Sequence, residues 1–440
     1  MPGLYLPTAD EFDPSTDDFI LEAVSKERQY KHFDLPLSDE NREITIDFSE
    51  QTEPHRFLPL LGFTDTVRKF VRNSQGIRVP KEKERPIRFA GHADAAYLQA
   101  YAEHLNRFYE QALTRDGTTG SVLAYRKGGG TNIHHAKSLF DEIKRRGDCT
   151  VITMDISGFF DCLDHMQLRD EIAGLLDVER LDGHHATVWK NVTRYSWVET
   201  DDLDKVLGKK RRGHGRICSP KDFVQHVRGR KDGLVRVHDH PFGIPQGTPV
   251  SGLYANIYLR SFDREMIAMW NRQGGSYRRY SDDIAVVLPL GAKAHHVVAV
   301  VEKMLADFGL AMSVEKMEHA DFAGGLLASP KPIQYLGFIF DGRTILIRPS
   351  SIGAYCRKMR RGIHAKIVAA KMKKVPSSKI YKREALRRYT HVGKGRNFLK
   401  YAYKAADVMS SEEIRQQVKP HMTWFKRCWR KEIAAVYRLG

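Results

Sequence analysis

Two adjacent aspartates, Asp282 and Asp283, stand in the stretch RRYSDDIAVVL, between a basic aromatic run and a β-branched apolar run. Neighbouring carboxylates repel each other unless a cation lies between or in front of them. A solvated turn is the simpler interpretation of an isolated pair, because Asp is a common turn residue. The flanking residues predict a β-hairpin from Arg278 to Leu288 with both aspartates at its tip, where a cation would offset their charge.

A third aspartate, Asp155, ends an apolar strand in the stretch VITMDISGFF. Taken alone, it fits equally well as the N-cap of a following helix. If this strand and the hairpin belong to one sheet, three carboxylates converge, and oxygen-only ligands of this kind favour magnesium. Two such ions, roughly 3.5–4 Å apart, stabilise the attacking and leaving oxygens of an in-line phosphoryl transfer. The three aspartates therefore predict phosphoryl transfer assisted by two Mg²⁺ ions.

The elements that must position these aspartates are those of a globular α+β protein. With 440 residues, of which 42% are hydrophobic, the chain is long enough for two or three subdomains. Apolar spacing predicts a helix over 94–113, and a second helix with Thr131 as its N-cap and its end at Gly147. Residues 1–75 give only weak helical signals, and 80–90 resemble a basic loop that runs into a strand. The order of these segments predicts a small antiparallel sheet covered by helices on one face.

Positive charge is concentrated in the last hundred residues. Residues 341–440 contain 26 Lys or Arg and 6 Asp or Glu, a net charge of +20, which leaves the first 340 residues at −3. Such a block predicts binding to a polyanion, most simply to nucleic-acid phosphates. Aromatic residues are interleaved with the charges: Tyr389, Tyr401, Tyr403, Trp424, Phe425 and Trp429. They favour a packed helical element over a solvated tail or a membrane-bound surface.

Cysteine usage and hydropathy predict the compartment. The cysteines have no C-x-x-C spacing and stand at Cys149, Cys162, Cys218, Cys356 and Cys428. This pattern favours a reducing compartment and argues against a zinc site. The amino terminus lacks the basic and apolar segments of a leader, and no run of about 18 apolar residues occurs. We therefore expect a cytoplasmic protein without a membrane partner.

Four motifs resemble the palm motifs of reverse transcriptases in the same order: MDISGFFDCLDH, FGIPQGTPVSGLYANIYL, YRRYSDDIAVV and YLGFIF. The resemblance covers roughly residues 80 to 345. It implies an α+β right-hand polymerase with fingers, a palm whose small antiparallel sheet is covered by helices, and a basic helical thumb. The implied parts are an amino-terminal extension over 1–75, fingers over 76–150, a palm over 151–345 with a fingers-like insertion around 165–240, and the thumb over 346–440.

The resemblance assigns roles to the acidic and aromatic residues. Asp155 and Asp282 would be the principal metal ligands, and Asp283 a weaker one. Phe160, five residues after Asp155, would exclude the 2′-hydroxyl of a ribonucleotide, so DNA is the expected product. The alternative is that Phe160 is a core residue, a role that fits its neighbour Phe159 better.

Other positions are implied to bind the incoming nucleotide. Gln246 would contact the nucleotide, and Gly247 would permit close backbone approach. Arg85 and Arg88 would hold the triphosphate through charge-assisted hydrogen bonds, with a plain surface loop as the alternative. Lys316 matches the lysine that protonates the pyrophosphate leaving group, although a solvated lysine is also consistent with the sequence.

Later positions are implied to contact template and primer. Gly252 would begin a helix under the template. The implied primer-grip hairpin contains Leu336, Gly337 and Phe338. The basic thumb would hold the template–primer duplex through Arg387, Arg388, Lys394 and Arg396.

Two upstream stretches, RPIRFAGHADAAYLQAYAEHL and SVLAYRKGGGTNIHHAK, resemble bacterial reverse transcriptases of the defence-associated groups. This resemblance implies cDNA synthesis from a structured non-coding RNA in antiphage immunity. The alternatives are a group II intron or retron enzyme, untemplated or protein-primed DNA synthesis, and a catalytically silent RNA-binding scaffold. The three intact aspartates argue against the scaffold. Template, primer and oligomeric state are left open.

Overall fold

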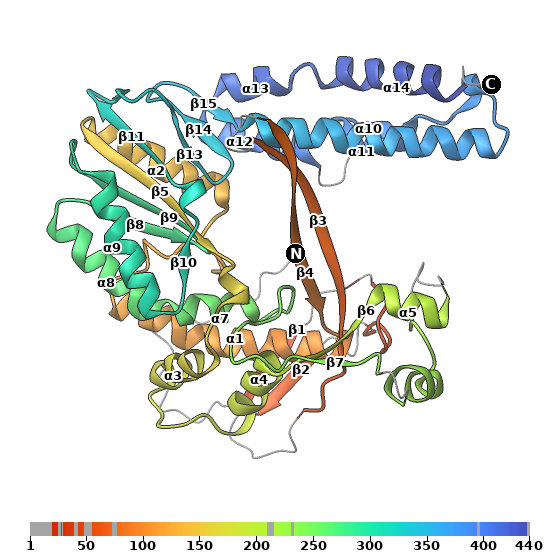
Figure 1. Cartoon of the computed structure of the whole chain (residues 1–440), viewed down its shortest axis with the longest axis horizontal. Helices are drawn as coiled ribbons and strands as arrows, with labels where there is room; N and C mark the ends of the chain where they lie inside the picture. Colours follow the sequence, from red (N-terminus) through yellow and green to blue (C-terminus); the bar gives the residue numbers. More distant parts are fainter. Residues whose placement is uncertain are drawn as a thin grey trace. The chain divides into compact units, whose positions relative to one another are not determined.

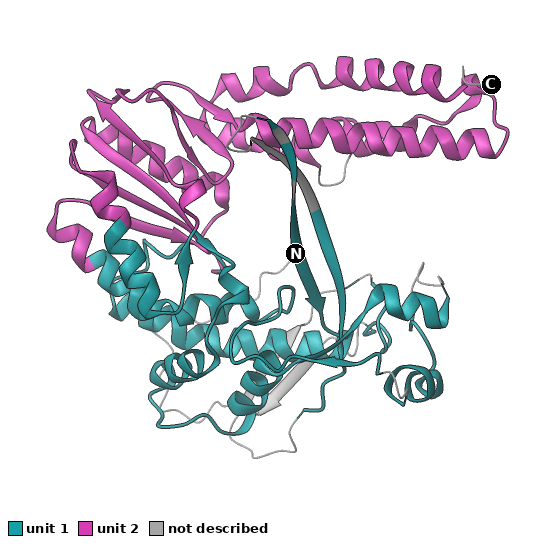
Figure 2. Cartoon of the chain, in the orientation of Figure 1, with its two compact units in different colours: residues 1–125, 156–267, 299–312 teal, residues 126–155, 268–298, 313–440 magenta. Residues whose placement is uncertain are grey.

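The computed structural model describes residues 20–24, 28, 30–38, 43–47, 55–72, 77–208, 215–229, 233–393 and 397–437. The chain divides into two compact units, each assembled from segments that are discontinuous in the sequence (Figure 2). Unit 1 comprises residues 1–125, 156–267 and 299–312, and unit 2 comprises residues 126–155, 268–298 and 313–440. All three predicted aspartates therefore belong to unit 2.

Unit 1 combines a mixed sheet with helices (Figure 1). The strand order is β4-β3-β6-β7, with β3 antiparallel to β4 and parallel to β6. The strands of unit 1 are β1 (Ile20–Val24), β2 (Glu43–Asp47), β3 (Leu60–Arg72), β4 (Arg78–Phe89), β6 (Ser196–Glu199), β7 (Arg236–Val237) and β10 (Ala311–Met312). Its helices are α1 (His92–Arg115), a 3-10 helix (Phe159–Asp161), α3 (His165–Leu176), α4 (Gly183–Thr193), α5 (Thr200–Leu207), α6 (Pro220–Asp222), a π-helix (Phe223–Arg228) and α7 (Ser251–Tyr258). Two helices, α8 (Arg260–Arg272) and α9 (Ala294–Asp307), divide between the units.

β3 and β4 form a long antiparallel ribbon, from Leu61 opposite Phe89 to Arg72 opposite Arg78. The weak helical signals of residues 1–75 gave no indication of β3. The basic loop expected at the start of 80–90 is wrong, because that segment belongs to β4. β-Branched and aromatic residues give the segment strand propensity, but pairing with another segment decides whether a strand forms. That pairing is not visible in the local periodicity of either strand.

The predicted helices are confirmed. α1 covers the expected 94–113 segment and extends it by two residues at each end. α2 (Asn132–Arg146) begins after Thr131, whose backbone N–H donates to Nδ1 of His134 (3.1 Å). It ends at Gly147, whose φ of 72° is the left-handed conformation that glycine supplies at helix ends.

Unit 2 contains the small antiparallel sheet that the sequence predicts. Its strand order is β12-β11-β5-β9-β8, and each neighbouring pair is antiparallel. These strands are β5 (Cys149–Ser157), β8 (Ser276–Tyr280), β9 (Asp283–Leu288), β11 (Glu318–Ala323) and β12 (Leu326–Leu327). A second antiparallel sheet contains β13 (Ile333–Tyr335), β14 (Phe338–Phe340) and β15 (Ile345–Ile347). The remaining helices are a 3-10 helix (Val314–Lys316), α10 (Pro349–Met372), a 3-10 helix (Ser377–Lys379), α11 (Arg383–Tyr389), α12 (Phe398–Met409), α13 (Glu412–Val418) and α14 (His421–Tyr437).

One hydrophobic core joins the sheets of unit 2 to α10–α14, which we call the thumb helices. Phe140 of α2 stacks on Phe340 of β14, with ring centroids 4.8 Å apart. Tyr389, Phe425 and Trp429 of the thumb helices are buried in the same core. The expectation of a packed helical block is therefore confirmed for these aromatics. In the part of the chain that the structure describes, no helix has both the length and the apolar character needed to cross a membrane.

Candidate active site

The strand register brings two of the predicted aspartates opposite each other. β5 and β9 pair antiparallel, and Asp155 is the register partner of Asp283. Both strands are almost entirely buried, because β5 and β9 lie in the middle of the sheet. Asp155 itself is only 6% exposed. The fold thus holds two carboxylates together at the end of the apolar strands, as the sequence predicts.

A tight turn places Asp282 beside this pair. Tyr280 of β8 pairs with Asp283 of β9, so the loop between the strands has two residues, Ser281 and Asp282. Ser281 has a φ of 61°, a conformation that two-residue hairpins usually assign to glycine. Arg279, which is fully buried, donates from Nη1 to the carbonyl oxygen of Ser281 (3.0 Å). A buried guanidinium therefore supports the turn that carries the aspartates.

Lys316 is the cation next to Asp155. Its Nζ donates to both carboxylate oxygens of Asp155. The backbone reinforces this arrangement, because the N–H of Ser313 donates to the carbonyl oxygen of Asp155 (2.7 Å) and the N–H of Lys316 to that of Ser313 (2.9 Å). Lys316 is thus positioned by the same strand that carries its partner.

The pKa of Asp283 reflects its burial and the negative charges beside it. Burial and the nearby carboxylates of Asp282 and Asp155 together raise the pKa of Asp283 to about 7, against the lowering effect of Lys316 and Arg348. Desolvation and like charges both disfavour the ionised carboxylate. A divalent cation would reverse this effect, because a bound metal is usually the largest local charge in its site.

The donor set fits a divalent cation in its chemistry. Hard cations such as Mg²⁺ take oxygen ligands, and the three aspartates supply only these. Among the described residues, however, no three His, Cys, Asp or Glu side chains are grouped as a metal cage. Lys316 holds the carboxylate of Asp155 in this arrangement. The case for a bound Mg²⁺ ion therefore rests on the mutual repulsion of the three carboxylates. The ammonium group of Lys316 already offsets part of this repulsion.

The predicted primer-grip residues form a tight hairpin in unit 2. Leu336 and Gly337 link β13 to β14 and have φ values of 47° and 94°. The carbonyl oxygen of Gly337 accepts from the N–H of Arg348, which immediately precedes α10 (3.0 Å). That of Leu336 accepts from Nδ2 of Asn132 (3.1 Å), which also donates to the hydroxyl of Tyr401 (2.8 Å). The hairpin is thus tied to α2, α10 and α12.

Asn132 gives a first prediction. Asn132→Asp keeps the side-chain shape and suits a helix N-terminus, but it removes the donor shared by Leu336 and Tyr401. We expect the hairpin to loosen, with primer-extension rates lower by roughly ten- to hundredfold and a melting temperature close to the parent's. Steady-state kinetics with varied primer concentration measure the effect. Tyr401→Phe, which leaves the bond to Leu336, should have a smaller effect, and equal rates in the parent and Asn132→Asp would exclude this role.

The predicted nucleotide contacts of unit 1 meet around one loop. Nε2 of Gln246 donates to the carboxylate of Asp161 (3.1 Å), and the backbone carbonyl oxygen of Gln246 accepts from the backbone N–H of Arg88 (2.8 Å). Gly247 has a φ of 126°, and a Cβ there would lie 2.7 Å from the carbonyl oxygen of Arg88. Only glycine fits this close approach. Phe160, half-buried, accepts from the N–H of Ile244 through its carbonyl oxygen (2.8 Å).

The two predicted fingers arginines differ in their surroundings. Arg85 is exposed on the β3–β4 ribbon. Arg88 is buried, donates from Nη2 to Glu199 (2.8 Å), and lies over the ring of Trp197 at 5.1 Å. Its charge is therefore already paired within unit 1, whereas Arg85 is open to solvent. Their binding of a triphosphate stays a prediction.

The remaining predicted residues lie in helices or outside the described chain. Gly252 is the second residue of α7, and a Cβ there would lie 2.7 Å from the ring of Tyr125. Arg387 and Arg388 are exposed on α11. Lys394 and Arg396 lie outside the described residues. Template and primer contacts of these residues stay predictions.

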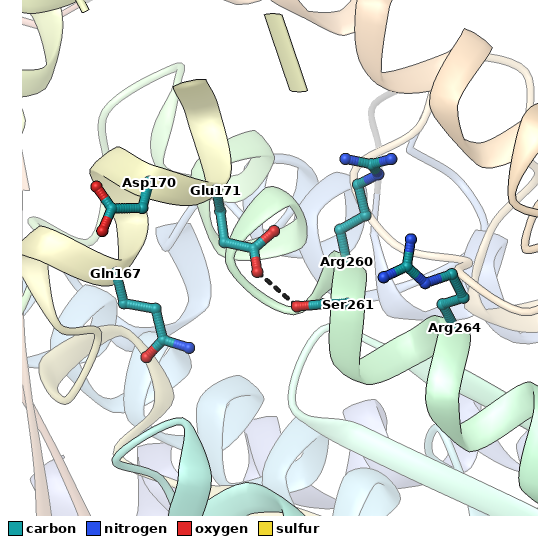
Figure 3. Close-up of a pocket in the computed structure, with 6 residues that line it drawn as sticks. All are labelled: Gln167, Asp170, Glu171, Arg260, Ser261 and Arg264. Atoms are coloured by element: carbon teal, nitrogen blue, oxygen red, sulfur yellow. Dashed lines mark hydrogen bonds between the residues drawn. The ribbon is translucent and has the colours of Figure 1, made fainter. Parts of the chain in front are cut away.

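A polar pocket of about 450 Å³ lies elsewhere in unit 1, between α3 and the start of α8 (Figure 3). Its lining residues are Gln167, Asp170, Glu171, Arg260, Ser261 and Arg264. Burial raises the pKa of Glu171, which accepts a hydrogen bond from the hydroxyl of Ser261. No residue that the sequence predicted for the site lines this pocket, and its two carboxylates and two guanidiniums offset each other.

Residues 219–340 match the family described as reverse transcriptase (RNA-dependent DNA polymerase). This part of the chain is therefore similar to reverse transcriptases. The matched residues include Gln246, Asp282, Asp283, Lys316 and the primer-grip hairpin, whereas Asp155 precedes them. The described helices and small antiparallel sheets confirm the predicted α+β class. No curated protein sequence matches this chain.

Solved telomerase structures are similar to this chain at low sequence identity. The apo telomerase of Candida tropicalis is 13% identical with a TM-score of 0.41, over 82% of this chain and 58% of that one. The same enzyme truncated from its C-terminal domain is also 13% identical with a TM-score of 0.41, over 64% of this chain and 54% of that one. Candida albicans telomerase in complex with a TWJ fragment of telomeric RNA is 11% identical with a TM-score of 0.38, over 87% of this chain and 61% of that one. The chain thus spans less than two thirds of the length of these structures.

Proposed function

We propose that the chain makes DNA on an RNA template by nucleotidyl transfer, with Asp155, Asp282 and Asp283 as ligands of two Mg²⁺ ions. The observation that carries the proposal is the β5–β9 register, which sets Asp155 opposite Asp283 beside the two-residue turn. When bound, the ions would promote attack by the primer 3′-hydroxyl and offset charge on the leaving pyrophosphate.

The residues around the aspartates support the same chemistry. Lys316 is half-exposed and touches Asp155, so its ammonium group can donate a proton to a leaving group that reaches the aspartates. Arg348 is exposed and lowers the pKa of Asp283, which places its positive charge near the carboxylates. Both cations suit a reaction in which negative charge accumulates on phosphate oxygens.

Primer extension tests the proposed function directly. The purified protein, a primer on an RNA template, deoxynucleoside triphosphates and Mg²⁺ should give a DNA product whose sequence is complementary to the template. Chelation by EDTA should stop synthesis, and fresh Mg²⁺ should restore it. A protein that binds the template but adds no nucleotide under any of these conditions would contradict the proposal.

Sugar selection gives a second prediction. The half-buried Phe160 would exclude a 2′-hydroxyl, while Phe159 is buried in the core. Phe160→Ala should therefore raise ribonucleotide incorporation relative to deoxyribonucleotide incorporation by roughly ten- to hundredfold, within the range that one pocket contact gives. Single-nucleotide incorporation assays measure the ratio. The matched control Phe159→Leu should leave the ratio unchanged, and an unchanged ratio in Phe160→Ala would make it a core residue.

We further propose that the template is a structured non-coding RNA, that the enzyme is cytoplasmic, and that its cDNA serves antiphage defence. The support is the resemblance of the upstream stretches to defence-associated enzymes. Sequencing of RNA that copurifies with the protein should give one dominant structured species, and loss of the gene should sensitise its host to phage. Intron or self-priming RNA would instead favour an intron or retron enzyme. DNA covalently attached to the protein would favour protein priming.

A further inference from the structure

The far end of the thumb helices has an exposed basic surface with no part in the site described above. We define the thumb tip as residues 371–383, from the last turn of α10 to the first residue of α11. It contains no Asp or Glu, and its basic residues are all exposed: Lys371, Lys373, Lys374, Lys379, Lys382 and Arg383. Met372 is 81% exposed and Tyr381 is 63% exposed. The tip therefore combines positive charge with an uncovered aromatic ring.

The backbone of the tip is fixed by its neighbours. The hydroxyl of Tyr437 donates to the carbonyl oxygen of Val375 (2.6 Å), and Nζ of Lys371 donates to that of Val436 (2.6 Å). Ile380 is buried. α10 and α14 pack side by side, and both contacts come from the end of α14 (Figure 1). The exposed side chains are thus presented by an ordered loop.

Lys374 occupies a conformation that lysine disfavours. It follows Lys373, the last capping residue of α10, and has a φ of 57°. The N–H of Val375 donates to the carbonyl oxygen of Ala370 (3.0 Å), which closes the helix end around Lys374. Glycine or asparagine is the usual residue at this position, and other residues cost about 1 kcal/mol there. Glycine is unstrained in this conformation, so a substitution of Lys374 by glycine removes the charged side chain without straining the backbone.

The length of α10 separates the tip from the hairpin near the aspartates. Its 24 residues correspond to roughly 36 Å at about 1.5 Å per residue. That length equals about ten base pairs of duplex at ~3.4 Å each. The part of a nucleic acid bound at the tip can therefore differ from the few base pairs bound near the aspartates.

We propose that the thumb tip binds a single-stranded or looped part of the RNA template, apart from the duplex at the aspartates. The proposal rests on the proposed function and names a second contact with its template. The lysines would neutralise phosphates, and Tyr381 offers a free face on which an unpaired base can stack. An anionic membrane fits less well, because the tip is a short irregular loop without the continuous apolar face of a membrane-surface helix.

Lys374 and Lys373 provide a matched pair of variants. Lys374→Gly removes one charge and also relieves the left-handed lysine, so the melting temperature should rise by about 1–2 °C. Lys373, with a φ of −83°, has no such strain, and Lys373→Gly should not raise it. Both variants should weaken binding of a single-stranded RNA, measured by fluorescence anisotropy, and each should lower the log–log salt slope by about 0.7. Parent affinity and parent slope in both variants would overturn the proposal.

Tyr381 tests the stacking contact separately from charge. Tyr381→Ala should weaken single-stranded RNA binding about tenfold, the lower part of the range for loss of one stacked base, with the parent's salt slope. Tyr381→Phe keeps the ring and should bind like the parent. If Tyr381→Ala also binds like the parent, the tip does not stack bases and the proposal is wrong.

A short template–primer separates this proposal from the proposed function. With a duplex of roughly six base pairs and no long overhang, too short to span α10, the tip variants should extend the primer at the parent's rate. With a long structured template they should extend it more slowly. An inactive parent would contradict the proposed function but leave the RNA-binding test intact. The variants can also be tested with vesicles of three parts phosphatidylcholine to one part phosphatidylglycerol. If the variants bind RNA like the parent but no longer bind these vesicles, which the parent does bind, the tip binds an anionic membrane and the tip proposal is wrong.

Discussion

Replacing Asp282 and Asp283 together by Ala should abolish Mg²⁺-dependent nucleotide addition, with a loss of at least about a thousandfold, because charge stabilisation by the bound ions contributes several kcal/mol. The same change should stabilise the metal-free protein at neutral and alkaline pH. Burial and neighbouring carboxylates raise the pKa of Asp283 to about 7. Primer extension and thermal unfolding measure the two effects on the same preparation.

The pH dependence of this stabilisation has a definite sign. An unfolded Asp has a pKa of about 3.9, so between about pH 4 and pH 7 the folded protein keeps a proton on Asp283 that the unfolded chain has released. The free energy of unfolding of the parent should therefore fall as the pH rises through this window. The double variant lacks this loss, and its advantage in melting temperature should be larger at pH 8 than at pH 5.

Magnesium supplies the control. A ligand that binds only the folded state raises the melting temperature, and ionised aspartates bind cations better than protonated ones. Mg²⁺ should thus stabilise the parent more at pH 8 than at pH 6 and should not stabilise the double variant. Magnesium-dependent synthesis by a folded double variant would remove these aspartates from the reaction.

The sequence reveals the aspartates because local patterns determine them. A strand that ends at Asp155 and a hairpin with Asp282 and Asp283 at its turn each follow from alternation and turn composition. Their convergence then needs only that both strands join one sheet. The register that pairs Asp155 with Asp283 is more specific than anything in the pattern, because it depends on contacts between distant segments.

Residues that act through distant partners could not be found in this way. Asn132 opens a helix, as many asparagines do, and its partner Leu336 lies 204 positions away. Arg279 sits in a basic run that suggests solvent exposure, yet it is fully buried under the turn. The β3–β4 ribbon was missed for the same reason, because its strands are defined by pairing with each other. Side-chain chemistry was predictable here, and long-range pairing was not.

Lys316 is the residue whose loss should separate stability from catalysis. Lys316→Met removes the ammonium group that donates to both carboxylate oxygens of Asp155. Because the lysine side chain is 48% exposed, solvent screens the pair and the loss of stability should be only about 1 kcal/mol. If Lys316 protonates the leaving pyrophosphate, the rate of nucleotide addition should fall about 10²–10⁴-fold. Single-turnover incorporation and thermal unfolding provide the two measurements.

Lys316→Arg is the matched variant, because it keeps the positive charge but replaces the acid. A guanidinium can pair with the carboxylate of Asp155 and should restore the melting temperature, with or without Mg²⁺. It does not release a proton at any pH at which the protein is folded, so the rate should stay low if proton donation is the role of Lys316. Full activity in Lys316→Arg would show that the charge alone matters, and that Lys316 only positions Asp155. Full activity in Lys316→Met would show that neither the charge nor the proton contributes, and the lysine would then be a solvated neighbour of the aspartates.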